Sequence, residues 1–152
     1  MKTLQVKNGD IQLDGGGKLQ FVKGTSKLLQ DISLWLRETY GSGFTTPGFG
    51  SLLPGMIGQG ITSSSIAAIQ SEIQRIINLY QANQIQQLQN SQNLNQLSYW
   101  NKSEIIHGLE SIQVLQGTGF VSATVSITTL NGSSTDINLI ITPNGIQVQN
   151  NG

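Results

Sequence analysis

Few side chains in this sequence are able to do chemistry. His107 is the only histidine and there is no cysteine, so a catalytic triad or a histidine-based metal centre would depend on His107 alone. Because it follows two isoleucines and precedes Gly108, we interpret it as a surface or helix-end histidine. Without cysteine there are no disulfides and no thiolate metal ligands. We therefore expect no cofactor, no metal and no enzymatic activity.

The carboxylates show no catalytic pairing either. A glycosidase needs two of them across a cleft, one with a raised pKa, and no pair in this sequence is marked in that way. We interpret them as solvated charges. Asp10 and Asp14 offer too few oxygen ligands for calcium, and Gly15–Lys18 lacks the spacing of a phosphate-binding loop. The acidic residues are Asp10, Asp14, Asp31, Glu38, Glu72, Glu104, Glu110 and Asp136.

Two tryptophans could stack on sugars or bases. Trp35 lies on the apolar stripe of a predicted helix, which favours core packing. Trp100 follows Tyr99 in a polar segment. It is either an anchor for a partner, since amphipathic aromatics are favoured at interfaces, or simply exposed.

The composition is that of a single domain with little charge. The chain has 152 residues, 11% of them charged, and eight basic residues balance eight acidic ones. Nucleic-acid binders usually carry a basic excess, so no nucleic-acid partner is expected. Low charge leaves association unopposed, which suits a subunit of an assembly. The first residues, MKTLQVKNGDIQ, contain no apolar run, so we expect no signal peptide, no membrane span and a cytosolic site of synthesis.

The periodicities predict an α+β fold that begins with a β-hairpin. Residues 3–7 and 10–14 alternate around Asn8-Gly9, a pair that favours a tight turn. A helix then starts with Thr25 or Ser26 as its cap and stops at Gly41. Residues 41–62 hold seven glycines, two prolines and several apolar residues, which predicts an ordered loop packed on the core or on a partner.

The second half of the chain predicts a long helix followed by an antiparallel sheet. We favour a helix over residues 64–89 and a loop after it, although the chain could also continue as a helix with a polar surface. A short helical turn capped by Ser103 is predicted over 102–109. Strands are predicted at 111–116, 120–130, 135–142 and 146–148, with Asn131-Gly132 as a hairpin turn and the odd-numbered side chains from Val121 to Ile127 on the apolar face.

Residues 9–53 resemble the baseplate-wedge and sheath-initiator family of contractile tails, whose members are described as lysozyme-like baseplate proteins. The long helix and strands that follow also fit this family. The stretch 83–101 is interpreted as a polar insertion within the single domain 1–152. The residues that carry the resemblance are Gly9-Asp10-Ile11, Leu19 through Gly24, Leu28 through Ile32, Trp35-Leu36, Gly41, Pro47, Phe49-Gly50 and Leu52-Leu53.

The resemblance implies a structural subunit in the baseplate of a virion, assembled in the host cytoplasm. Implied partners are the tail sheath protein, other wedge proteins and a nearby tail tube or hub, in a ring with multiple copies. A sheath subunit would add strands to the sheet of residues 111–149 by β-augmentation. The residues expected to contact partners are Gly41, Phe44, Pro47, Phe49, Gly50, Trp100, Val121, Val125, Ile127, Ile137, Leu139 and Ile141.

This sequence departs from the family at one point. Members carry an acidic–basic pair after the first helix, where this chain reads Gly41-Ser42-Gly43-Phe44. Two other hypotheses stay open beside the structural one. The chain could be a carbohydrate- or receptor-binding module that uses Trp100 and the strand surface. It could also cleave peptidoglycan, which is the weakest hypothesis because no acid–base constellation is visible.

Overall fold

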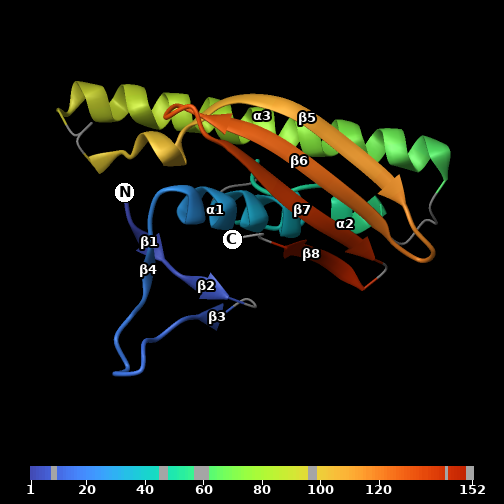
Figure 1. The fold of residues 1–152 in the computed structure, drawn as a ribbon, viewed down its shortest axis with the longest axis horizontal. Helices are drawn as coiled ribbons and strands as arrows, with labels where there is room; N and C mark the ends of the chain where they lie inside the picture. Colours follow the sequence, from blue (N-terminus) through green and yellow to red (C-terminus); the bar gives the residue numbers. More distant parts are fainter. Residues whose placement is uncertain (8–9, 45–47, 57–61, 96–98, 143, 150–152) are drawn as a thin grey trace.

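The protein is an α+β domain in which one face of a sheet packs on helices (Figure 1). The computed structural model describes residues 1–7, 10–44, 48–56, 62–95, 99–142 and 144–149. The predicted fold class is confirmed. The elements in chain order are β1 (Thr3–Leu4), β2 (Val6–Lys7), β3 (Asp10–Ile11), β4 (Phe21–Val22), α1 (Thr25–Arg37), α2 (Leu53–Met56), α3 (Ser63–Asn93), a 3₁₀ turn (Lys102–Glu104), β5 (Ile106–Gln116), β6 (Val121–Thr129), β7 (Ser134–Thr142) and β8 (Gly145–Gln149).

The C-terminal sheet is an antiparallel meander with the order β5-β6-β7-β8. Its predicted register is confirmed, because Val121, Ala123, Val125 and Ile127 are all buried while the residues between them are not. In Figure 1 the sheet lies in front of α1 and α3, which cover its apolar face. The other face is open and polar, as alternation in a half-covered sheet requires.

Strand β5 begins at Ile106, earlier than predicted, and the helical turn predicted over 102–109 is wrong. Only Lys102–Glu104 is helical, and its cap is Asn101, with Glu104 completing a capping box. Sequence reasoning took Ser103 as the cap. The strand starts here because Ile105 and Ile106 are buried β-branched residues.

Helix α1 is bounded by backbone contacts rather than by the residues predicted. Its N-cap is Gly24, with φ 61°, and no side chain caps it; the predicted Thr25 or Ser26 cap is wrong. A Cβ at Gly24 would lie 2.9 Å from Ser103 Oγ. The helix ends at Arg37, before Gly41. The chain after it is extended because Ser51 N–H donates to the carbonyl of Glu38 at 2.8 Å, and Thr39 forms a β-bridge with Ser51.

Helix α3 runs four residues beyond the predicted end at 89, to Asn93. Its apolar residues from Ile69 to Tyr80 form a buried stripe, which continues through a buried amide, Gln84. The Gln84 Nε2 donates to the carbonyl of Glu104 at 2.6 Å, and its Oε1 accepts from the N–H of Ile106 at 3.0 Å. These bonds attach the polar half of the helix to the start of β5. The segment 83–101 is thus helical as far as Asn93.

The N-terminal segment is a three-way strand junction rather than one hairpin. Strands β2 and β3 pair around residues 8–9 as predicted, but β1 pairs with β4. The backbone closes a ring of three bonds: Gln5 N–H to the Gln20 carbonyl at 2.9 Å, Gln12 N–H to Gln5 at 2.9 Å, and Gln20 N–H to Gln12 at 3.0 Å. This arm stands off from the body (Figure 1).

We predict that Gln84→Ala lowers the free energy of unfolding by roughly 1–3 kcal/mol, because it leaves a buried N–H and a buried carbonyl without their hydrogen-bond partner. Urea denaturation followed by circular dichroism measures this. Gln86→Ala is the matched control, since Gln86 is exposed on the same helix. Equal midpoints for the two variants would show that the Gln84 bridge does not stabilise the fold.

Candidate functional site

The loop between α1 and α2, residues 38–52, is closed at its base by a buried serine. Ser51 is fully buried and its Oγ donates to the Leu36 carbonyl at 2.7 Å. The Tyr40 N–H donates to the Ser51 carbonyl at 2.9 Å. Gly50 has φ 102°, and a Cβ there would lie 2.9 Å from the backbone of Glu38 and Thr39. Glycine is therefore required at this crossing.

An ion pair from α3 holds the same loop. The Glu72 carboxylate is 5% exposed and accepts from the Leu52 N–H at 2.7 Å and from Arg75 at 2.7 and 2.8 Å. Arg75 also donates to the Gly50 carbonyl at 3.4 Å and lies 5.4 Å from the centre of the Tyr40 ring. Burial raises the pKa of Glu72, but the bonds from Arg75 and Leu52 outweigh it, so the net pKa is lowered. The same pair raises the pKa of Arg75.

The predicted loop residues divide into exposed and inward-facing sets. Gly41 has φ 78° and is exposed, and Phe44 is completely exposed. Phe49 turns inward, with its ring centre 4.8 Å from that of Trp35. Gly50 is buried at the crossing. Pro47 lies outside the described residues. The loop is thus held at its base, around Gly50 to Leu52, and carries one exposed aromatic side chain, Phe44.

The sheet side chains expected to contact partners lie in the core instead. Val121, Val125 and Ile127 on β6 are buried, as are the three residues of β7: Ile137, Leu139 and Ile141. Both strands are internal, and the edges of the sheet are β5 and β8. The six side chains of β6 and β7 are apolar and therefore pack under the helices. An added strand would meet β5 or β8 and not these side chains.

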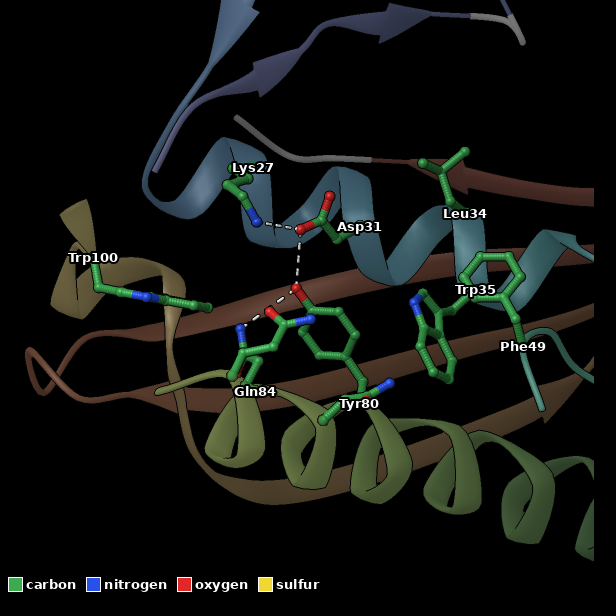
Figure 2. Close-up of a pocket in the computed structure, with 10 residues that line it drawn as sticks. Lys27, Asp31, Leu34, Trp35, Phe49, Tyr80, Gln84 and Trp100 are labelled. Carbon is green, nitrogen blue, oxygen red and sulfur yellow. Dashed lines mark hydrogen bonds and ion pairs between the residues drawn. The ribbon is translucent and has the colours of Figure 1, made fainter. Parts of the chain in front are cut away.

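Trp100 borders a cavity of about 270 Å³ between α1 and α3 (Figure 2). In the interior, Lys27 Nζ donates to Asp31 Oδ2 at 2.5 Å and the Tyr80 hydroxyl donates to the same oxygen at 3.0 Å. Burial raises the pKa of Tyr80, and the Asp31 carboxylate raises it further. The phenol therefore stays protonated and remains a donor. Trp35 packs against the core beside this cavity, as its helical stripe predicted.

His107 is exposed on β5, so the predicted surface position is confirmed, although the residue lies in a strand and not at a helix end. Within the described ranges, no three His, Asp or Glu side chains lie close enough together to hold a metal ion. In the same part of the chain, no helix has the length and hydropathy to cross a bilayer.

Comparison of the chain with protein-family models, with curated proteins and with solved structures gives no match. The resemblance to sheath initiators therefore remains an expectation from the sequence.

The interpretation of the acidic residues as solvated charges is wrong for Glu72 and Glu104, which are buried. Arg75 and Gln84 were given no role in the sequence analysis. Glu72 and Arg75 carry a signal, because opposite charges three apart on a helix are neighbours. The burial of Gln84 could also have been predicted, since it lies four residues after Tyr80 on the buried stripe. The role of Glu104 is predictable only if Asn101 is taken as the cap, because Glu104 is then three residues later, as in a capping box.

We predict that Glu72→Gln costs roughly 1–3 kcal/mol of unfolding free energy at pH 7. A carboxylate whose pKa is lowered by folding stabilises above its ordinary value of 4.5, and this contribution is lost as the pH falls through the folded pKa. The difference from the unchanged protein should therefore shrink below pH 4.5, as measured by urea unfolding at several pH values.

Glu38→Gln is the matched control for this prediction, because Glu38 is exposed. It should leave stability at pH 7 almost unchanged. A Glu72→Gln difference that does not vary with pH would contradict the assigned ion pair.

Proposed function

We propose that this protein is a structural subunit of a contractile-tail baseplate that starts sheath assembly by accepting a strand at an edge of its C-terminal sheet. The observation that carries the proposal is the outer edge of β5. This edge is the longer of the two, with 11 residues in β5 against five in β8. No other strand of the described chain pairs with it. An unpaired edge is a template for another chain.

The second half of β5 is regular and offers backbone groups to a partner. Its register to β6 shifts near Ile106/Gly108 and Leu109/Ser111, and is regular after Ser111. The Gly117 N–H donates to the Phe120 carbonyl at 2.8 Å. Because bonded and non-bonded pairs alternate in an antiparallel ladder, Ile112 and Val114 direct their N–H and carbonyl groups outward. No charged residue follows Glu110 in this strand, so little there would repel an incoming strand.

Two further surfaces suit contacts with neighbouring subunits. On the N-terminal arm, Val6 pairs with Ile11, Leu13 with Leu19, and Leu4 with Phe21. Paired residues share a face and so do residues two apart, which places all six side chains on one face. Four of them, Ile11, Leu13, Leu19 and Phe21, are between 48% and 57% exposed. Such exposed apolar faces mark interaction surfaces.

The loop of residues 38–52 is the other such surface. The wedge proteins are proposed to meet the exposed Phe44 ring, which belongs to the same loop whose residues Gly50 and Leu52 are held by the Glu72–Arg75 pair. An acidic–basic pair thus serves this loop, although it comes from α3 and not from the loop itself. A loop that is already held at its base loses less conformational entropy when it docks.

We predict that Val114→Pro stops sheath formation, because proline removes an outward N–H from the β5 edge. Val114→Ala is the matched control: it loses the same packing but keeps the N–H. Negative-stain electron microscopy of tails assembled with each variant counts sheathed and bare tubes. Val148→Pro and Val148→Ala apply the same test to the β8 edge. Normal sheaths with both proline variants, each shown to be folded by circular dichroism, would sink the strand-addition proposal.

For the arm, we predict that Leu13→Lys reduces incorporation into baseplates by about tenfold or more, because docking would bury an unpaired charge. Quantitative mass spectrometry of purified particles measures the copies incorporated. Leu94→Lys is the control, since Leu94 is 66% exposed and lies away from the arm. Equal incorporation of the two variants would remove the arm from the proposed interface.

A further inference from the structure

The cavity between α1 and α3 has no part in the proposed strand addition. It measures about 270 Å³ and its rim includes two exposed amides, Asn83 and Gln87. Ligand cavities in proteins usually span roughly 300–1,000 Å³, so this one suits a group no larger than a single ring. Both tryptophans of the chain, Trp35 and Trp100, line it.

The aromatic walls are held in fixed orientations. Trp100 Nε1–H donates to Ser91 Oγ at 3.0 Å, which orients the indole. Trp35 is fixed by two edge contacts, with ring centres 4.8 Å from Phe49 and 5.8 Å from Tyr80. In Figure 2, Trp100 stands at one end of the cavity and Trp35 at the other, with the polar groups between them. A ligand would therefore meet aromatic side chains that need no reordering.

The polar groups of the cavity keep unused hydrogen-bonding capacity. Lys27 is 5% exposed, and among the described residues its ammonium donates only to Asp31 Oδ2. An ammonium has three N–H donors, so two of them can still donate to a ligand. Asp31 accepts both of its side-chain bonds on Oδ2, and a carboxylate oxygen has room for further donors. Donors and an acceptor thus lie side by side, with aromatic side chains at both ends.

The charges of the cavity select a neutral ligand. Lys27 and Asp31 are the only charged residues that line its described walls, and they pair with each other. Because these two opposite charges offset each other, they give neither an anion nor a cation a net attraction. A ligand that donates to a carboxylate and accepts from an ammonium through adjacent groups would use both.

We propose that this cavity binds one neutral sugar ring of a saccharide. A pyranose has adjacent hydroxyls, each both donor and acceptor, and an apolar C–H face. The hydroxyls match the Lys27 ammonium and the Asp31 carboxylate, and the C–H face matches the Trp100 indole. Asn83 and Gln87 at the rim supply amides to further hydroxyls. The site is separate from the β5 edge, so sugar binding and sheath assembly can fail independently.

The two tryptophans make the test direct, because their indole N–H signals both report on the cavity. Nitrogen-15-labelled full-length protein is titrated with D-glucose, D-galactose, N-acetyl-D-glucosamine and methyl α-D-mannopyranoside, each to about 100 mM. We expect at least one sugar to shift both indole signals saturably, with a Kd of about 1–10 mM. No saturable shift with any of the four would overturn the proposal.

Variants then locate the binding. Trp100→Ala should weaken affinity by about tenfold or more, read on the remaining Trp35 signal. Tyr99→Ala, which removes the adjacent and more exposed aromatic ring, should change affinity less than about twofold. Gln87→Ala, at an exposed rim position, gives a second reading should Trp100→Ala unfold. Unchanged affinity in both cavity variants, or shifts produced by N-acetyl-L-tyrosinamide and by none of the sugars, would overturn the sugar assignment.

Discussion

A buried carboxylate, that of Glu104, joins the three parts of this molecule. It has no exposed surface and accepts from the Met1 ammonium at 2.6 Å, the Asn101 N–H at 2.8 Å and the Gly24 N–H at 3.3 Å. These donors belong to the N-terminal arm, the segment before β5 and the start of α1. An isolated buried charge is costly, so all three segments must come together for the carboxylate to be tolerated.

Gln84 extends this junction to the long helix. Its amide links α3 to the backbone of Glu104 and Ile106, directly beside the buried carboxylate. The two side chains therefore set where the arm leaves the body, where α1 begins and where β5 enters the sheet. The sugar-sized cavity lies next to them, because Gln84 and Tyr80 form part of its wall. Its geometry thus rests on the same buried polar contacts as the fold.

The surfaces proposed for assembly share a different physical basis. The β5 edge offers backbone groups, the arm offers an apolar face and the loop offers Phe44. The loop is supported by Glu72 and Arg75, the arm by its closed ring of glutamine backbone bonds, and the edge by the packed sheet. A chain with so little surface charge opposes such contacts weakly.

The sequence by itself determined the elements whose side-chain period is strong. Alternation from Val121 to Ile127 and the stripe through Ile73 and Tyr80 predict the sheet and the helix core, because burial of apolar faces is local and periodic. Only the tertiary structure decided the end of α1, the early start of β5, the three-way arm and the placing of Trp35 and Trp100 around one cavity. Each depends on polar partners far apart in the chain, such as Ser51 with Glu38 and Glu104 with Gly24. Polar contacts of that kind leave no periodic trace in the sequence.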